Sequence, residues 1–577
     1  MKLVDLKTPF EEDLDPAAPW QDYPRPTLVR DSYINLNGEW LFSKRKTGDD
    51  HPTVLGNITV PFAPESRLSG MDMTLKKGER LGYVKRFTKP ELKEGERLIL
   101  HFGAVDQIAY LSVNAVPIYC HIGGYLPFGV DITDYLHEGE NSILLEALDD
   151  LDLDIPYGKQ RKKRGGMWYT PISGIWQTVW MEVVPENEIE ELKVTATLDS
   201  VTLTVVGGDA DKKLTLHTEE GDKVYTFTGD TVTLPIEDPK HWTPETPYLY
   251  RYTLESGKDK VRSYFALRTV RVEKVGENSY IFLNGKPYFF HGLLDQGYFS
   301  DGIYLPATAE GYKNDILTMK SLGFNMLRKH IKVEPEIFYY YCDLYGMAVF
   351  QDMVNSGKYS FLRDTALPTL GIKKGIRQKA SDYRKEIFED ICRETLDQLH
   401  NHPSVVYYTV FNKGWGQYDA DRLYTELKTY DPTRIYDATS GWFFEKESDV
   451  DSHHIYFKKL SLTASPDRPL VLSEFGGYSY KVAGHSANEK KTYGYRFFKE
   501  KAPFEDALDS LYRDEVIPLV AKGLAATVYT QVSDVEDETN GLFTYDRQVL
   551  KVDKERMKLT SNAIFTAFQE KTGQNEA

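Results

Sequence analysis

The chain is poor in cysteine and has no long apolar run. Its 577 residues include only three cysteines, Cys120, Cys342 and Cys392, which are too few and too scattered for a disulfide framework. No two of them have the spacing of metal ligands. The acidic, proline-containing start lacks the apolar stretch of a signal peptide, and no later segment reaches the about 18 apolar residues of a transmembrane helix. We therefore expect a cytoplasmic protein without a membrane span.

Positive charge is scarce relative to negative charge. The 70 basic and 87 acidic residues leave a formal net charge of −17, and such a field repels nucleic-acid phosphates and anionic lipid. The basic run at 161–164 departs from this trend, and we interpret it as an exposed loop. Nucleic acid and membranes are thus not expected partners. The 13% of aromatic residues suits core packing as well as stacking on sugar rings.

The first half of the chain has the pattern of antiparallel β-structure. Between about residues 33 and 184, short alternating segments are broken by Gly, Pro, Asn and Asp, and no helical apolar stripe interrupts them. A second group of such segments, from about 192 to 256, has the size of an immunoglobulin-like sandwich. We therefore predict a jelly-roll-like β-sandwich at 1–185 and an immunoglobulin-like β-sandwich at 186–275.

After about residue 275, short apolar runs alternate with helical segments. Eight such runs occur within about 300 residues, as a closed (β/α)8 barrel requires. The expected strands are 289–294, 325–330, 347–353, 405–412, 435–440, 452–457, 470–475 and 525–532. A barrel at 276–577 would place its active site at the C-terminal ends of these strands.

Each expected strand ends in a side chain capable of chemistry. One such residue alone is weak evidence, because a polar residue after a strand is more often a helix cap or a loop contact. Their coincidence on one rim is stronger evidence for a site. In chain order these residues are Asp295, Arg328, His330, Asp352, Asn412, Lys413, Ser440, Trp442, Tyr456, Glu474, Gln531 and Asp534.

Six segments resemble glycoside hydrolase family 2, the family of β-galactosidases, β-glucuronidases and β-mannosidases. Two of them, at 23–42 and 174–183, are similar to its N-terminal sugar-binding sandwich. The barrel segments, in the family's order, are GFNMLRKH at 323–330, FNKGWGQYD at 411–419, VLSEFGGYS at 471–479 and YTQVSDVEDETNGLFTYDR at 529–547. The resemblance implies two sandwiches and a catalytic barrel. It also implies hydrolysis of terminal β-linked sugars with retention and without a redox cofactor.

That chemistry requires a nucleophilic carboxylate and a proton-donating carboxyl group about 5 to 5.5 Å apart. Glu474 matches the family's nucleophile, but the family's Asn-Glu motif at the end of strand four reads Asn412-Lys413 here. An ammonium group, whose pKa starts near about 10.4, is a poor general acid near neutral pH. We expect a Lys413–Glu474 ion pair, worth roughly 3 kcal/mol at an effective dielectric of about 20, and a rate loss of about 10² to 10⁴.

Three explanations of Lys413 compete. The first is a family hydrolase that is impaired or inactive because of a substitution, natural or deliberate, while its sugar pocket is preserved. The second takes the proton donor from elsewhere on the rim, with Asp352, His330, Glu334 and His454 as candidates. The third makes Lys413 a Schiff-base nucleophile, which the neighbouring carboxylate argues against.

Further roles are carried over from the resemblance. Asn412 would bind the sugar 2-hydroxyl, and Tyr456 would orient the nucleophile. His330 and Asp352 resemble hydroxyl-binding residues of the sugar pocket. The remaining expected substrate-binding residues are Trp415 and Trp442, as an aromatic wall, and Asp295.

The sugar itself is predicted from a missing lysine. Family glucuronidases grip the substrate carboxylate with an Asn-x-Lys element, but the corresponding stretch here reads Asn540-Gly541-Leu542, and a match at 488–490 lies elsewhere. We therefore predict a β-galactosidase-like enzyme acting on a neutral small-molecule or oligosaccharide β-glycoside, with no metal or cofactor. The alternatives are a non-catalytic carbohydrate-binding protein on the same scaffold or a β-glucuronidase. A homo-oligomer stays open, because many relatives are dimers or tetramers.

Overall fold

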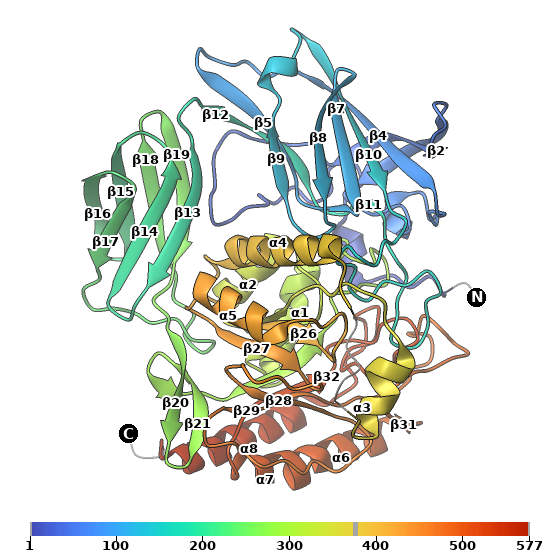
Figure 1. Cartoon of the computed structure of the whole chain (residues 1–577), viewed down its shortest axis with the longest axis vertical. Helices are drawn as coiled ribbons and strands as arrows, with labels where there is room; N and C mark the ends of the chain where they lie inside the picture. The colour runs from blue at the N-terminus through green and yellow to red at the C-terminus, as the bar shows by residue number, and fades with distance from the viewer. Residues whose placement is uncertain (1–2, 373–378, 575–577) are drawn as a thin grey trace.

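A computed structural model of the chain describes residues 3–372 and 379–574 and shows two β-sandwiches beside an α/β barrel (Figure 1). The fold class predicted from the sequence is thereby confirmed. Within the described residues, no helix is both long enough and apolar enough to cross a membrane.

The first sandwich consists of a four-stranded and a six-stranded antiparallel sheet, with strand orders β1-β12-β5-β9 and β3-β2-β4-β10-β7-β8. Alternating residues face its core, as with Ile143, Leu145 and Ala147 on β10, which is the pattern of a half-buried strand. Its strands are β1 (Tyr33–Asn35), β2 (Gly38–Lys46), β3 (Thr53–Val60), β4 (Glu79–Thr88), β5 (Glu96–Phe102), β6 (Val105–Asp106), β7 (Ile108–Val113), β8 (Val116–Ile122), β9 (Phe128–Asp131), β10 (Glu140–Leu148), β11 (Gly174–Ile175) and β12 (Val179–Pro185).

The second sandwich pairs a three-stranded sheet, β13-β14-β17, with a four-stranded sheet, β16-β15-β18-β19. Leu203, Leu214 and Leu254 lie in the core between them. The strands are β13 (Ile189–Ala196), β14 (Ser200–Gly207), β15 (Asp211–Thr218), β16 (Gly221–Thr228), β17 (Thr231–Pro235), β18 (Tyr250–Ser256) and β19 (Asp259–Phe265).

Eight parallel strands form the barrel in the order β27-β26-β25-β24-β23-β32-β29-β28. The edge strands β27 and β28 lie side by side, so the barrel is nearly closed. Each strand coincides with one of the eight apolar runs. The strands are β23 (Phe290–Asp295), β24 (Met326–Lys329), β25 (Ala348–Asp352), β26 (Val405–Asn412), β27 (Ile435–Ser440), β28 (Asp451–Ile455), β29 (Leu470–Gly476) and β32 (Leu524–Thr530).

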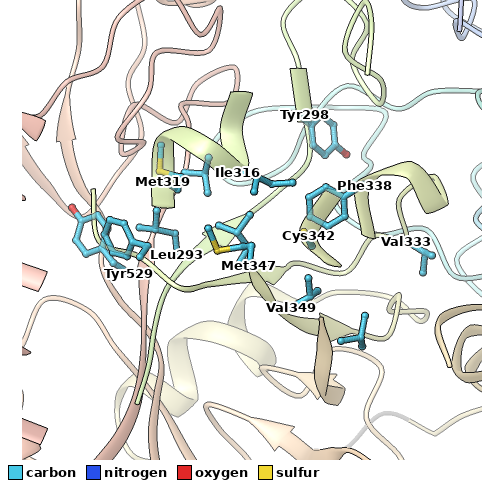
Figure 2. Packing of buried hydrophobic residues seen from close by; sticks show 14 of the residues in the cluster. Leu293, Tyr298, Ile316, Met319, Val333, Phe338, Cys342, Met347, Val349 and Tyr529 are labelled. Atoms are coloured by element: carbon cyan, nitrogen blue, oxygen red, sulfur yellow. The ribbon is translucent and has the colours of Figure 1, made fainter. Parts of the chain in front are cut away.

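Helices surround the barrel, and their apolar faces pack on the outside of the strands. Figure 2 shows Ile316 and Phe338 from two of these helices packed in one cluster with strand residues such as Leu293 and Val349. The helices are α1 (Glu310–Ser321), α2 (Glu336–Tyr345), α3 (Leu367–Thr369), α4 (Asp382–Leu399), α5 (Ala420–Tyr430), α6 (Lys501–Leu511), α7 (Ile517–Val520) and α8 (Lys554–Thr572).

The sequence pattern predicts helices near 312–322, 335–345, 382–400 and 507–522. It does not anticipate α3, α5 and α8. The helix expected near 507–522 is divided, because a π-helical turn at Tyr512–Val516 separates α6 from α7. Pro518 stands in the first turn of α7, where its missing N–H is tolerated.

The two ends of the barrel are covered differently. At the N-terminal end, a small sheet of β20 (Val270–Val275), β21 (Asn278–Leu283) and β22 (Lys286–Pro287) closes the interior, and Ile281 packs against Phe290 and Phe350. At the C-terminal end lie β30 (Tyr478–Tyr480) and β31 (Arg496–Phe498), together with the long connection between β10 and β11 of the first sandwich. The C-terminal end of the barrel is thus covered by segments of the barrel domain and of the first sandwich.

Candidate active site

Glu474 lies near the end of β29 and is completely buried. The pairing of β29 is irregular on both sides at this point, since register shifts occur at His453/His454 and between Leu472 and Phe475. Such irregularities re-aim side chains at barrel rims. One carboxylate oxygen of Glu474, Oε2, contacts the site residues described next, whereas Oε1 accepts no hydrogen bond from any residue within 3–372 and 379–574.

Lys413 and Tyr456 both contact this Oε2 atom. The Lys413 Nζ atom lies 2.7 Å from it, and the Tyr456 hydroxyl donates a hydrogen bond to it at 2.9 Å. The Lys413 side chain is only 7% exposed. The ion pair expected from the sequence is therefore present, and it is shielded from solvent.

The backbone of Lys413 is strained. It adopts a left-handed conformation with φ 55°, and its N–H donates to the Ser440 carbonyl oxygen at 2.9 Å. A non-glycine residue in this region costs about 1 to 3 kcal/mol and is found most often at functional sites. The ammonium group lies 5.6, 5.8 and 5.5 Å from the ring centres of Trp415, Trp442 and Tyr456. Both expected tryptophans thus face the same charge.

The charge of Glu474 is stabilised by its surroundings. Burial would raise its pKa, but His454, Lys413, His330 and Arg328 together lower the pKa well below its usual range. Arg328 Nη1 lies 3.5 Å from Oε1 of Glu474. Glu474 is therefore held as a carboxylate, the form that a nucleophile needs.

Arg328, at the end of β24, connects the site residues but was named from the sequence only as a strand-end residue. Its guanidinium donates to Asp352 Oδ1 at 2.9 Å, to the Ser473 carbonyl oxygen at 2.8 Å and to Asn412 Oδ1 at 3.0 Å. The contact with Asn412 fixes its amide, and Asn412 Nδ2 has no hydrogen-bond partner among the described residues. The signal in the sequence is a pair of charged residues, Arg328 and Lys329, at the end of the short buried strand β24.

His330 and Asp352 form a buried pair on the same rim. His330 Nδ1 lies 2.8 Å from Asp352 Oδ2, and His330 Nε2 has no hydrogen-bond partner in the part of the chain that the structure describes. Burial lowers the pKa of His330 to about 4, against the opposing effect of Asp352. Burial would raise the pKa of Asp352, but Arg328 and His330 lower it. A neutral imidazole and an ionised carboxylate are both poor general acids near neutral pH.

The other expected residues divide into those that join the site and those that do not. Asp295 lies 2.6 Å from Lys329 Nζ, and Glu334 lies 3.1 Å from the same atom. This buried cluster is separate, because no hydrogen bond or ion pair between described residues joins Asp295 or Glu334 to Glu474 or Lys413. The expectation that Asp295 contacts the substrate therefore has no support from its contacts.

Several neighbours of the site were missed by sequence reasoning. Tyr495 stacks on Tyr456 with ring centres 3.7 Å apart, and Trp168 stacks on Trp415 at 5.2 Å. Lys159 lies 5.2 Å from the centre of the Trp415 ring. Trp168 and Lys159 come from the first sandwich, so no pattern within the barrel sequence could indicate them. In the described ranges, 3–372 and 379–574, no cluster of His, Cys, Asp and Glu has the arrangement of a metal site.

Comparison with known proteins places this geometry in a family. Residues 274–560 match "Glycosyl hydrolases family 2, TIM barrel domain", and residues 178–268 match "Glycosyl hydrolases family 2". The β-galactosidase of Priestia megaterium is 24% identical over 503 residues, covering 79% of this chain and 45% of that protein. The β-glucuronidase of Streptococcus agalactiae is 23% identical over 604 residues, covering 93% and 97%.

A solved structure shares the arrangement of domains. The β-D-glucuronidase of Dictyoglomus thermophilum has a TM-score of 0.73 at 20% identity, covering 94% of this chain and 98% of that one. At this identity the likeness concerns the fold alone. The chain spans about half the length of curated relatives such as the Priestia protein. Because the two family matches together cover well over half of the chain, it belongs to glycosyl hydrolase family 2.

Proposed function

We propose that the chain is a retaining exo-β-glycosidase whose turnover is impaired by Lys413, the first of the three explanations of this residue. The observation that carries the proposal is the 2.7 Å contact between Lys413 Nζ and Glu474 Oε2. It puts a cation beside a nucleophile, on the rim where a retaining enzyme needs a second carboxyl group. The substrate is a small-molecule or oligosaccharide β-glycoside, and the expected compartment is the cytoplasm.

In the first step, Glu474 Oε1 attacks the anomeric carbon, and the bond from that carbon to the aglycone oxygen breaks. Oε1 suits this role because it accepts no hydrogen bond from the described residues, while Oε2 is held by Tyr456 and Lys413. The leaving oxygen needs a proton. Donation by Lys413 would remove the positive charge that pairs with Glu474 in a buried site, and an uncompensated buried charge is costly. An unactivated leaving group therefore departs slowly.

In the second step, water must displace Glu474 from the anomeric carbon. A base normally removes the proton of this water, and an ammonium group cannot accept one. Activated aryl leaving groups depart without a proton, so they accelerate the first step. They do not accelerate the second step, which still lacks a base. The glycosyl–enzyme ester should therefore accumulate on such substrates.

A glutamate at position 413 would restore the usual pair. The glutamate side chain is one bond shorter than that of lysine. A carboxylate at this position would also repel Glu474, whereas the lysine ammonium attracts it. Both effects widen the separation from the 2.7 Å contact toward the about 5 to 5.5 Å of retaining enzymes. Asn412 Nδ2, which has no protein partner, is then free to donate to the sugar 2-hydroxyl.

The test compares three proteins on a panel of nitrophenyl β-glycosides: the chain itself, Lys413→Glu, and the double variant Lys413→Glu/Glu474→Gln. We expect Lys413→Glu to gain about 10² to 10⁴ in kcat/KM on at least one glycoside, and the double variant to lose this gain. A fluorosugar adduct should form on Glu474. An inactive Lys413→Glu protein on every sugar, or an adduct formed without Glu474, would refute the proposal.

The alternative is a carbohydrate-binding protein without catalysis. The same panel separates the two, because a binding protein would take up sugars with or without Lys413 and would hydrolyse none in either form. The family relatives above include a β-galactosidase and a β-glucuronidase. The glycone is therefore either a neutral sugar, as the sequence predicts, or a uronic acid.

A further inference from the structure

A lysine of the first sandwich lies over the catalytic end of the barrel. Lys159 belongs to the connection between β10 and β11. This connection is bound to the barrel loops, since Tyr157 donates its N–H to the Asn355 carbonyl oxygen at 3.0 Å and its hydroxyl to the Gly357 carbonyl oxygen at 2.8 Å. A Cβ atom at Gly158, where φ is +69°, would meet the Ile331 carbonyl oxygen at 2.9 Å. Only glycine allows so close an approach.

The ammonium group of Lys159 is buried without an ion-pair partner. The residue is 5% exposed, and Nζ donates one hydrogen bond, to the Met167 carbonyl oxygen at 3.2 Å. Its other neighbours are the rings of Trp168, Tyr169 and Trp415, at 5.7, 5.7 and 5.2 Å. Among the residues that the structure describes, no carboxylate lies within ion-pair distance. An ammonium has three donors, so two remain available in an environment where an unpaired charge is unfavourable.

Lys159 lies close to the catalytic residues. Its ammonium and that of Lys413 lie around one indole, at 5.2 and 5.6 Å from the Trp415 ring centre. The His330 ring is 6.4 Å from that indole. Polar atoms without partners among the described residues lie nearby, namely the donors Trp415 Nε1 and Asn412 Nδ2 and the acceptor His330 Nε2, whose ring donates through Nδ1 to Asp352. Unpaired buried donors of this kind indicate a polar ligand.

The charges around Lys159 favour an anion. Burial lowers its pKa to about 8, Glu538 and Glu474 raise it, and Lys413 lowers it further. Glu474 is already compensated by Lys413 and Arg328. Glu538 accepts a hydrogen bond from Gln531 Nε2 at 2.6 Å, and burial raises its pKa. The negative charges near Lys159 are therefore already compensated. An incoming carboxylate could accept hydrogen bonds from the unused N–H groups of the Lys159 ammonium without strong repulsion.

We infer that Lys159 binds a carboxylate of the substrate's sugar, so that the preferred glycone is a β-linked uronic acid. The inference rests on the proposed function. A uronic acid carries a carboxylate where a neutral hexose carries a hydroxymethyl group, and a carboxylate forms the stronger, charge-assisted hydrogen bond with an ammonium. Lys159 then replaces, from another domain, the lysine that is missing near Asn540.

A binding experiment tests this inference without turnover. Isothermal titration calorimetry at pH 7 measures D-glucuronate, D-galacturonate, D-glucose and D-galactose with the full chain. The variants are Lys159→Met, which removes the charge, Lys159→Arg, which keeps it, and Lys258→Met, an exposed lysine of the second sandwich, as control. We expect one uronate to bind at least about tenfold more tightly than its neutral counterpart. Lys159→Met should lose this preference, and Lys159→Arg and the control should retain most of it.

A kinetic experiment keeps the two hypotheses distinguishable. In the Lys413→Glu background, kcat/KM is compared for nitrophenyl β-uronides, neutral nitrophenyl β-glycosides and neutral β-glycosides with a carboxylated aglycone. Hydrolysis of uronides that depends on Lys159 supports the inference. Hydrolysis of neutral glycosides alone, a preference that follows the aglycone carboxylate, or a uronide preference that survives Lys159→Met overturns it while leaving the glycosidase proposal intact. Loss of all binding and all hydrolysis overturns both.

Discussion

Lys413 and Tyr456 contact the same oxygen of Glu474. Lys413 Nζ is 2.7 Å from Oε2 and the Tyr456 hydroxyl is 2.9 Å from it, so Oε1 alone is available for reaction. The same two side chains that hold the nucleophile also determine which of its oxygens can attack. The expected effects of substitutions at the site follow from these different roles of Oε1 and Oε2.

Removing the Tyr456 hydroxyl should release one side of the nucleophile. In the Lys413→Glu background, Tyr456→Phe should lower kcat by about ten- to hundredfold, the effect of one hydrogen bond to a charged group, with a smaller change in KM. Steady-state kinetics on a nitrophenyl glycoside measures both. Tyr495→Phe, which keeps the stacked ring and removes a different hydroxyl, should change kcat less. An equal loss in both variants would show that the effect is not specific to the hydrogen bond between Tyr456 and Glu474.

Lys413→Ala should respond to azide. Azide is already an anion, so it attacks the anomeric carbon of the glycosyl ester without a base, and the Glu474 carboxylate leaves. The product is a β-glycosyl azide of retained configuration. With an activated aryl glycoside, millimolar azide should raise turnover of Lys413→Ala several-fold or more and that of the parent chain less, because Lys413 still occupies the site. Product analysis by NMR checks the configuration, and an α-azide would contradict Glu474 as the nucleophile.

The pH profile of Lys413→Glu should show a general acid whose pKa is higher than that of an ordinary glutamic acid. The new carboxyl group would face the ionised Glu474, and a like charge disfavours its own ionisation. Its pKa should therefore lie above the usual value of about 4.3. Because the protonated form is the active one, kcat/KM should fall as the pH rises through that pKa. A profile with no alkaline decline up to pH 9 would indicate that position 413 does not donate the proton.

Uronate affinity should weaken above about pH 8. The ammonium form of Lys159 is the binding form, and its pKa in the free protein is about 8, so the affinity should be about tenfold lower at pH 9 than at pH 7. The groups around Lys159 are Glu538, Glu474, Lys413, His330 and Tyr169. Calorimetry across this range provides the measurement. Lys159→Arg stays charged and should show little change, so an equal decline in that variant would assign the titration to another group.

The Arg328 cluster should contribute to stability as well as to the site. Arg328→Met would leave the Asp352 carboxylate buried and without its guanidinium partner, at a cost of about 3 to 5 kcal/mol in the free energy of unfolding. The stability that Asp352 confers is present above its unfolded pKa of about 3.9 and is lost as the pH falls through its lowered folded pKa. The loss on substitution should therefore be full at pH 7, measured by denaturant unfolding.

The matched control is Arg422→Met, which removes an exposed guanidinium 2.6 Å from Glu389. It should cost less than about 1 kcal/mol, because exposed ion pairs are screened by water. Equal losses of unfolding free energy in the two variants would contradict the prediction that the buried Arg328 cluster stabilises the fold more than an exposed ion pair does.

Local patterns were sufficient for the fold. All eight barrel strands coincide with runs identified in the sequence, because most of them, such as β23, β26 and β29, are buried on both faces and consist mainly of apolar residues. Helix α8 was missed since its charged residues conceal a narrow buried stripe that includes Met557 and Ile564. Such a stripe is recognisable only once the surface it covers is known.

The sequence by itself determined which residues stand at the strand ends, and with them the pairing of Lys413 and Glu474. Parallel strands of a barrel end on one rim whatever the intervening helices are. Only the tertiary structure decided that Asp295 belongs to a separate cluster and that Lys159 and Trp168 lie against Trp415. The contacts of Lys159 and Trp168 with Trp415 join residues more than two hundred positions apart, and they depend on how a sandwich loop packs on the barrel. Periodicity within one element carries no information about that packing.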